Sequence, residues 1–533
     1  MVITTAENKN KKARKSKKHK HKSATHRSGQ FLNTQSVFWI LFILSICVIS
    51  YINIFDQKLD LNGDNVGYYL LGKALAKGEG FVNIWNAEKP PSNHFPPGYP
   101  TIISLIMFII SDNVITIKIA NGLFFFLSIV VLFLLFNRAQ VEIKFTALTT
   151  LIIAVNSHLL RYASIMMSEI PYLFFTSLAL YLTTKINFSK KPYKNILLLI
   201  IISCLAIAYY IRTIGIAAVF GIIFYFILRK KWLYVLYTGI SFMVLVIPWF
   251  IRGQILGGNP YLNQLIMVNP YDSTLGFVGI VDIFKRFLTN FLRYISIEIP
   301  NGCLPFLEKA LYSKPLIGWS IGIAILGLFI YGIIKLKSYQ TLFIGYLAGI
   351  LGITFLWPEV WYGIRFIVGI IPFLTFFVFY GFYEFIKTIL EKKHLSLKFS
   401  PLFLSPILLF YFFPLQQQHI KSQRTYPPNW MNYFRLANWV KQNTPSNTIV
   451  SCRKAEFFYL FSDRSVTVYA FTRDDQKLIQ RLREQEVDYV VVDQLGYGST
   501  PKYLVPAIQK NPNKFRVVIH LKNPDTYLLE FLN

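Results

Sequence analysis

Apolar runs of about twenty residues, separated by short polar segments, recur along most of the chain. This is about the length that an α-helix needs to cross roughly 30 Å of hydrocarbon. Only helices or closed barrels satisfy their backbone groups in lipid, and these runs lack the alternation of barrel strands. The pattern therefore predicts an all-α polytopic membrane protein. About 11 transmembrane helices are predicted, at residues 36–55, 113–136, 144–160, 170–186, 194–211, 213–229, 232–250, 315–334, 338–357, 364–386 and 399–414.

Composition agrees with this class and bears on possible partners. Only 15% of the 533 residues are charged, whereas a soluble protein carries about a quarter. The formal net charge of +29 would suit a nucleic-acid partner, but residues 1–29 hold eight Lys and two Arg against a single Glu. Such a segment is expected to be disordered. We predict that residues 1–34 form a basic cytoplasmic tail that contacts anionic membrane lipid, and we predict no nucleic-acid partner.

The basic residues between the predicted spans set the orientation. With the tail inside the cell, every loop predicted to be cytoplasmic is basic, as the positive-inside rule requires. These residues are Arg138, Lys144, Lys185, Lys190, Lys191, Lys194, Arg229, Lys230, Lys231, Lys335, Lys337, Lys392, Lys393 and Lys398. The apolar stretch 98–111 is too short to span, and we predict an interfacial helix there. The transmembrane domain, 35–415, then carries long outer loops at 56–112 and 251–314.

In this orientation, charged side chains from five separate segments are predicted to meet at the outer face of the membrane. Charged groups at membrane depth are costly and usually functional. They comprise Asp64 and His94 in the first outer loop, Arg161 with Glu169, Arg212, Arg252, and Arg365. The gathering of these groups at one face favours an enzyme over a transporter, whose polar groups lie near mid-membrane on broken helices.

Residues 426–533 differ from the rest of the chain, because short apolar strands alternate there with polar helices. Strands are predicted at 448–452, 465–470 and 487–493, and helices at 433–442, 476–485 and 502–510. We predict a small extracytoplasmic α/β domain, with no glycine-rich loop of the nucleotide-binding kind. A disulfide between Cys303 and Cys452 is geometrically possible, and no zinc-binding spacing is present.

Five short motifs give the chain a resemblance to the GT-C superfamily of integral-membrane glycosyltransferases. The chain is most similar to the branch of protein O-mannosyltransferases (dolichyl-phosphate-mannose-protein mannosyltransferases) and lipid A aminoarabinose transferases, over residues 35–380. The motifs are Asp64-Asn-Val-Gly-Tyr68-Tyr69, His94-Phe-Pro96-Pro97-Gly98-Tyr99-Pro100, Ser168-Glu169-Ile-Pro171, Pro248-Trp249-Phe-Ile-Arg252 and Tyr362-Gly-Ile-Arg365-Phe.

The resemblance implies transfer of a sugar from a polyprenyl-phosphate donor to an acceptor outside the cytoplasm. It assigns the general base to Asp64, with Glu169 as a second candidate acid, although Asn65 stands where family members often carry another acid. A hydroxyl acceptor needs a base within hydrogen-bond reach, and guanidinium groups bind a departing phosphate. The candidate substrate-binding residues are Arg252, Arg365, Arg212, Tyr68, His94 and Tyr99. One base suffices for a single displacement, which inverts the anomeric centre.

Alternatives remain at the level of the sequence. Asp64 precedes a helical pattern and is also suited to an N-cap, while Arg252 and Arg365 stand beside tryptophans that are typical of interfacial anchors. A divalent metal ion at the Asp64 and His94 loop is compatible with the residues. A flippase of lipid-linked saccharides is the rival function. The sugar, and whether the acceptor is a protein hydroxyl, a lipid or a glycan, stay open. A bacterial inner membrane is the expected location.

Overall fold

The computed structural model describes residues 33–61, 64–258, 260–271, 275–393 and 400–532. The predicted basic tail lies almost wholly outside these residues. The chain forms two compact units, residues 1–42 and 43–533. Both outer loops, the helices from α3 onward and the sheet belong to the second unit.

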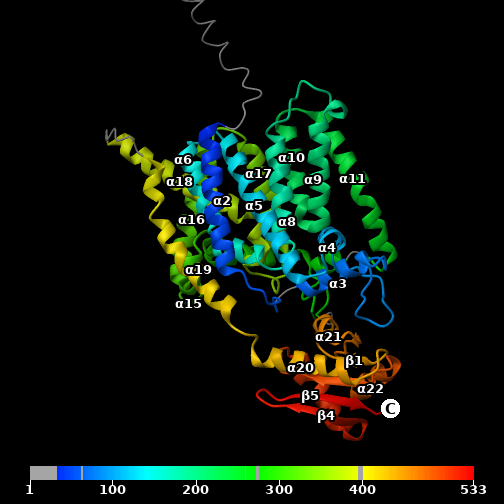
Figure 1. Ribbon diagram of the computed structural model, residues 1–533. Helices are drawn as coiled ribbons and strands as arrows, with labels where there is room; N and C mark the ends of the chain where they lie inside the picture. The colour runs from blue at the N-terminus through cyan, green and yellow to red at the C-terminus, as the bar shows by residue number, and fades with distance from the viewer. Residues whose placement is uncertain (1–32, 62–63, 259, 272–274, 394–399, 533) are drawn as a thin grey trace, which may run out of the picture. The chain divides into compact units, whose positions relative to one another are not determined.

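Each predicted span coincides with a helix or a pair of helices (Figure 1). Five helical segments are long and apolar enough to cross a bilayer, and α6 with α7, bent by 59°, makes a sixth if the pair is one span. The chain is therefore an all-α integral membrane protein with a small added sheet, and the count of eleven crossings stays a prediction. The helices are α2 (Thr34–Ile54), α5 (Val114–Arg138), α6 (Ile143–Ala154), α7 (Ser157–Ala163), α8 (Glu169–Thr183), α9 (Ile196–Ile211), α10 (Ile216–Leu228), α11 (Trp232–Ile255), α16 (Pro315–Lys335), α17 (Gln340–Leu356), α18 (Ile371–Lys392) and α19 (Ile407–Gln423).

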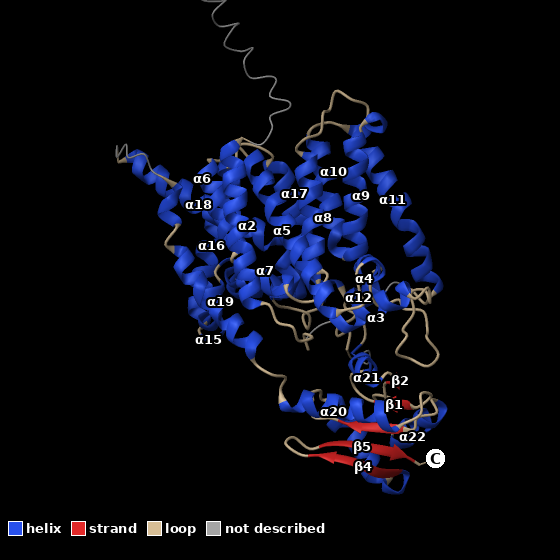
Figure 2. Cartoon of the chain, in the orientation of Figure 1, coloured by secondary structure: helices blue, strands red, loops and turns tan. Residues whose placement is uncertain are grey.

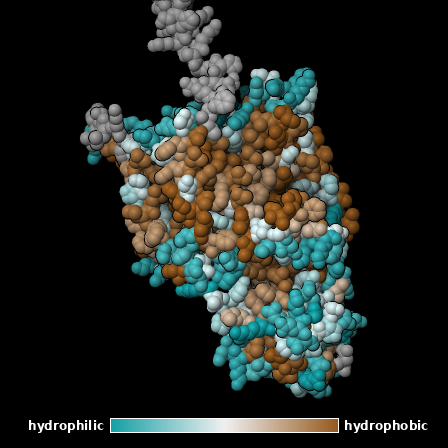
Figure 3. Space-filling model, viewed as in Figure 1, coloured by the Kyte–Doolittle hydropathy of each residue, from teal (hydrophilic) through white to brown (hydrophobic). Residues whose placement is uncertain are grey.

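A band of apolar side chains crosses the helical part of the surface, with hydrophilic residues above and below it (Figure 3). Shorter helices lie in the two loops predicted to be outside. They are α3 (Asn65–Ala76), α4 (Gly98–Ile109), α12 (Pro260–Ile266), α13 (Ile280–Arg293), α14 (Ile299–Cys303) and α15 (Glu308–Ser313). The expected helix at 98–111 is present as α4. It buries Tyr99 and Ile103 and exposes Phe108 and Ile109, a two-sided pattern that suits an interfacial helix.

Close helix packing in the membrane depends on glycine at one crossing. A Cβ atom on Gly381 of α18 would collide with the backbone carbonyl oxygen of Leu328 in α16. Small residues let membrane helices approach closely, and overpacking typically costs about 1–3 kcal/mol.

We therefore expect Gly381→Ala to lower the unfolding temperature of the purified protein in detergent. Gly327→Ala is the matched control, because a Cβ atom there would meet no atom within 4 Å. Equal unfolding temperatures for the two variants would contradict the packing argument.

The strands all belong to the C-terminal part of the chain (Figure 2). They are β1 (Ile449–Ser451), β2 (Ser465–Thr467), β3 (Tyr489–Val492), β4 (Phe515–Leu521) and β5 (Thr526–Phe531), in the order β2-β1-β3-β5-β4. The strands β2, β1 and β3 run parallel, and β5 is antiparallel to both β3 and β4. Four α-helices accompany the sheet: α20 (Pro428–Asn443), α21 (Ala455–Ser462), α22 (Asp475–Glu484) and α23 (Val505–Lys510).

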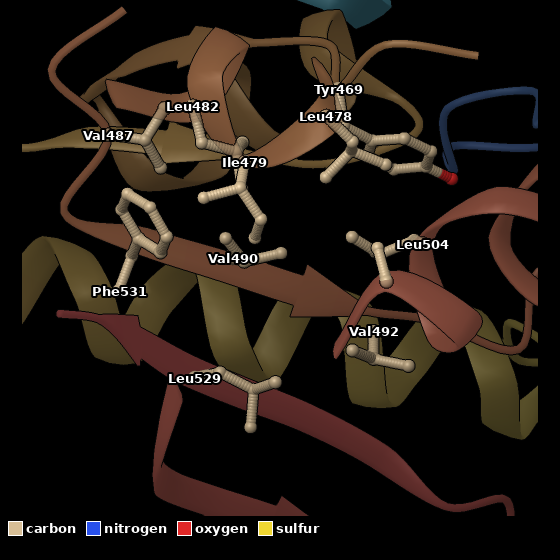
Figure 4. Packing of buried hydrophobic residues seen from close by; sticks show 11 residues of the cluster. Tyr469, Leu478, Ile479, Leu482, Val487, Val490, Val492, Leu504, Leu529 and Phe531 are labelled. Carbon is tan, nitrogen blue, oxygen red and sulfur yellow. The ribbon is translucent and has the colours of Figure 1, made fainter. Parts of the chain in front are cut away.

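The spacing of apolar residues in α22 explains how this sheet is covered. Leu478, Ile479 and Leu482 share one helix face and pack on Val490 of β3 (Figure 4). The predictions of β1, β2, β3, α20, α22 and α23 are confirmed, whereas α21, β4 and β5 were not predicted. The possible disulfide is not formed, because Cys303 and Cys452 are both buried free thiols.

Candidate functional site

Asp64 stands at the start of α3, and its side chain turns to a partner far away in the sequence. It occupies the N-cap position but makes no side-chain cap hydrogen bond. Instead its Oδ2 accepts a hydrogen bond from Nη2 of Arg365 at 2.7 Å. The Asp64 side chain remains 33% exposed, so the carboxylate is both ion-paired and accessible from outside the protein.

Glu169, the first residue of α8, is the second acid of the cluster. Its Oε1 accepts hydrogen bonds from Nη1 of Arg212 at 2.6 Å and from Nε of Arg365 at 2.8 Å. The side chain is only 2% exposed, and Oε2 has no hydrogen-bond partner among the described residues. Because a buried carboxylate needs compensating charge, the two guanidinium groups hold Glu169 ionised. Arg365 bridges the two acids.

The four charged residues share a structural position, since each lies at a helix end or a break between helices. Arg212 separates α9 from the following 3-10 turn, and Arg365 follows Gly363, whose φ of +116° favours glycine. Helix ends leave backbone groups unpaired and allow side chains to leave the helix axis. The cluster is therefore built from four breaks in the helical framework and not from helix interiors.

Tyr68 joins this cluster through Ser168. The Tyr68 hydroxyl lies 3.3 Å from Oγ of Ser168, which also accepts a hydrogen bond from Arg212 at 3.1 Å. The Tyr68 ring packs on Phe95 and Tyr99, with centroids 4.6 and 5.1 Å away. Burial, and then the charge of Asp64, raise the pKa of Tyr68 well above its usual range. Tyr68 therefore remains a neutral hydroxyl at physiological pH.

Tyr99 is buried beside Tyr68 and is hydrogen-bonded to α5. It is 1% exposed, and its hydroxyl donates a hydrogen bond to Oδ1 of Asn121 at 3.1 Å. Asn121 in turn donates to the carbonyl oxygens of Ile165 and Met167, in the turn that leads to Glu169. Through Asn121, Tyr99 is therefore linked to the turn before α8, and its candidate role in substrate binding stays a prediction.

Tyr261 of α12 is a neighbour that the sequence did not indicate. Burial raises the pKa of Tyr261 to about 12. The nearby charges of Arg212 and Arg365 lower this pKa, and that of Asp64 raises it. Its ring lies 6.2 Å from that of Trp357. No repeated or charged pattern in the 251–314 loop singles out this tyrosine.

Arg252 is not hydrogen-bonded to the acidic cluster and lies at a separate cavity. Its guanidinium group donates to the carbonyl oxygen of Ser92 at 3.0 Å and stacks on Trp249 at 4.6 Å. Nη1 is buried and has no partner among the described residues. The cavity has a volume of about 440 Å³, and Phe81 and Tyr210 help line it.

His94 lies at a second cavity, of about 190 Å³, together with Phe95 and Glu456. The His94 ring contacts Phe95, with centroids 4.5 Å apart, and Phe95 contacts Tyr68. His94 is thus linked to the Asp64 cluster through one intervening ring. Arg161 pairs with another acid, Asp60, at 4.0 Å. Among the described side chains, Glu169 is the acid that is hydrogen-bonded to the same guanidinium group as Asp64.

The described side chains form no ready-made cluster of metal ligands. Divalent cations need several oxygen or nitrogen ligands converging on one point. Within the part of the chain that the structure describes, no group of three or more His, Cys, Asp or Glu side chains converges in this way. The carboxylates of Asp64 and Glu169 are both engaged by guanidinium groups, and a divalent ion at the Asp64 and His94 loop stays a prediction.

Comparison with solved structures identifies the fold. The AglB oligosaccharyltransferase of Archaeoglobus fulgidus, tethered with an acceptor peptide, aligns with a TM-score of 0.56 at 10% identity, over 92% of this chain and 74% of that one. ArnT of Cupriavidus metallidurans bound to undecaprenyl phosphate aligns with a TM-score of 0.57 at 10% identity, over 92% of this chain and 98% of that one. An AglB complex with zinc and sulfate also aligns, with a TM-score of 0.56 at 11% identity, over 91% of this chain and 72% of that one.

A scan against protein-family models and a search of curated protein sequences found no match. The structural matches show that the chain has the fold of these AglB and ArnT structures.

Proposed function

We propose that this GT-C-fold membrane protein is a glycosyltransferase that moves a sugar from a polyprenyl-phosphate donor to an acceptor at the outer face of the membrane. The observation that carries the proposal is the exposed, ion-paired carboxylate of Asp64 beside the guanidinium groups of Arg365 and Arg212. This arrangement supplies a base and a cationic surface at one place, which are the two things that sugar transfer from a lipid phosphate needs.

In this reaction Asp64 takes the proton from the acceptor hydroxyl as its oxygen attacks the anomeric carbon. Arg365 holds one oxygen of the Asp64 carboxylate, and the partial exposure of Asp64 leaves the carboxylate reachable by an acceptor. Glu169 is buried and held by both arginines. Its proposed role is therefore to position Arg365 and Arg212, and not to transfer protons.

The leaving phosphate is proposed to be stabilised by guanidinium donors. A guanidinium group has five N–H donors, and Arg365 uses two nitrogens for the two acids, which leaves further donors for phosphate oxygens. Arg252 lines an apolar and aromatic cavity, and its Nη1 has no partner among the described residues, which suits the phosphate end of a prenyl chain. With a single base, the transfer proceeds by one displacement and inverts the anomeric centre.

Two features distinguish this proposal from a flippase of lipid-linked saccharides. The charged cluster lies at helix ends and not along a central pathway, and Asp64 and Arg365 neutralise each other within hydrogen-bond distance. The finer assignments rest on the resemblance alone: a mannosyl or aminoarabinosyl donor, a protein, lipid or glycan acceptor, and a bacterial inner membrane with the α/β domain outside.

The test is reconstitution of the wild-type protein in proteoliposomes with undecaprenyl phosphate carrying tritiated mannose or aminoarabinose, with extracted cell-envelope material as the acceptor pool. We expect labelled sugar to appear in the acceptor fraction, with an inverted anomeric configuration by NMR. A separate assay follows the labelled lipid between leaflets. Movement between leaflets without transfer would overturn the proposal in favour of the flippase.

A further inference from the structure

The sheet of the C-terminal α/β part has a reversal point of the kind that forms a crevice. From β1 the chain crosses to β2 on one side, and then returns past β1 to β3 on its other side. The connections that leave the carboxyl ends of β1 and of β2 therefore run in opposite directions. In open sheets with parallel strands, ligands bind outside the carboxyl ends at such a point.

Two cations and two aromatic rings meet at this crevice from three different loops. Arg453 and Lys454 follow β1, Phe471 follows β2, and Tyr497 follows β3. The Arg453 guanidinium carbon lies 5.1 Å from the centre of the Phe471 ring and 4.8 Å from that of Tyr497. Lys454 Nζ lies 4.8 Å from the centre of the Tyr497 ring.

Neither cation forms a close ion pair with a protein carboxylate, and the buried Asp493 is the carboxylate whose charge interacts with that of Arg453. Within the described part of the chain, no carboxylate lies within 4 Å of either Arg453 or Lys454. Nε of Arg453 is buried and has no hydrogen-bond partner among the described residues. A guanidinium group that contacts rings through its faces still presents its N–H donors at its edges, in the fork that suits a carboxylate or phosphate.

The loop that supplies Tyr497 is held in place by a buried acid. Asp493 is 3% exposed and accepts hydrogen bonds from the Leu495 N–H at 3.1 Å and from the Thr500 hydroxyl at 3.3 Å. Thr500 also pairs with the Tyr469 hydroxyl at 2.9 Å, and Gly496, with a φ of +88°, turns the chain before Tyr497. The crevice wall is therefore fixed and does not form only when a ligand arrives.

A continuous set of contacts leads from this crevice towards Asp64. Glu456, three residues after Arg453, lines the same small cavity as His94 and Phe95, and Phe95 packs on Tyr68. Nearby, the N–H of Val466 in β2 donates to the carbonyl oxygen of Trp85 in the first outer loop at 2.8 Å. The segments that follow β1 and precede the crevice thus also contact the loop that carries His94 and Phe95.

We infer that this crevice recognises an anionic saccharide, through the carboxylate or phosphate of a charged sugar, and holds it as the acceptor of the transferase. Arg453 and Lys454 bind the charge, and the exposed ring of Phe471 packs on the sugar. The role of this saccharide as an acceptor rests on the proposed function, whereas its binding to the crevice requires neither a sugar donor nor catalytic turnover.

The test uses the full-length protein in nanodiscs of zwitterionic lipid. The probes are a galacturonate tetrasaccharide, its carboxyl-reduced neutral counterpart, and a phosphate-bearing disaccharide, each titrated by calorimetry. We expect Arg453→Gln/Lys454→Gln to weaken binding of one of the acidic probes by about tenfold or more, and we expect the neutral sugar to bind weakly to every form. Whichever acidic probe responds identifies carboxylate or phosphate as the recognised group.

The matched control is Lys477→Gln/Arg481→Gln, which removes the same charge from α22 on the same domain and should leave the affinity unchanged. Phe471→Ala, at a half-exposed ring, is a second test variant, which keeps both charges and should also weaken binding. It keeps the inference testable if the double variant misfolds.

Equal affinities across all these forms would overturn the inference. A second contrary result is also possible: the double variant could lose binding to phosphatidylglycerol vesicles and still bind the saccharides. That result would overturn the inference and assign the two cations to membrane lipid. Asp64→Asn should retain saccharide binding, so failure of the proposed catalysis and failure of this site are distinguishable.

Discussion

Asp64→Asn is expected to lower the rate of sugar transfer by about 10²–10⁴-fold, the usual effect of removing a general base. Asparagine keeps the size of the side chain and still accepts a hydrogen bond from Arg365, but it cannot take a proton from the acceptor. Because the Asp64 side chain is one-third exposed, the substitution should leave the fold and membrane insertion intact. The measurement is the initial rate of transfer in proteoliposomes with equal amounts of inserted protein.

Asp112→Asn is the matched control for this experiment. Asp112 is also an acid of the first outer loop, ion-paired to Lys73 at 2.9 Å, but it lies outside the Asp64 cluster. Its variant should transfer sugar at a rate within a few-fold of wild type. If Asp64→Asn transferred sugar as fast as Asp112→Asn, Asp64 would be a structural residue and the search for a base would move to Asp60.

Glu169→Gln is expected to destabilise the protein by about 3 kcal/mol, since removing one member of a buried charge cluster leaves the other charges uncompensated. The carboxylate is 2% exposed and faces both Arg212 and Arg365. Loss of this charge also frees the guanidinium groups to reorient, so transfer should fall along with stability. Chemical unfolding in detergent and the transfer rate are measured on the same preparation.

A second variant separates electrostatics from simple loss of packing. Adding Arg212→Gln to Glu169→Gln removes one of the unpaired cations, so the double variant should be more stable than Glu169→Gln alone. Additive losses would instead show that Arg212 and Glu169 contribute independently, and the charge-cluster interpretation would be wrong. Restored stability without restored transfer would support a direct role for Arg212 in the reaction.

The helical framework was predictable because lipid imposes a strong pattern on the sequence. Each predicted span falls on a helix, and the break between α6 and α7 was hidden only because an apolar run does not show where its backbone bends. The C-terminal strands β4 and β5 were not predicted, although both contain several apolar residues. Their pairing with each other and with β3 depends on contacts across the sheet, which the sequence pattern does not show.

The site was predictable in its members but not in its pairing. Charges that gather at one face were visible as motifs, and the structure joins Asp64, Glu169, Arg212 and Arg365 in one cluster. Nothing in the sequence showed that Arg365 bridges two acids or that Arg252 stands at a separate cavity. Those facts depend on which helix ends meet, and tertiary packing decides this between residues as much as 301 positions apart.

The separation of the cluster along the chain has a consequence for biogenesis. As the chain is inserted from its N-terminus, Glu169 enters the membrane region well before Arg365 exists. Its first cation is Arg212, 43 residues later, which arrives with α9, the helix that packs next to α8. The α8–α9 hairpin can therefore enter the bilayer with its acid already neutralised. Asp64 meets Arg365 only when most of the membrane part has been made, so a nascent chain holds no assembled reaction centre until then.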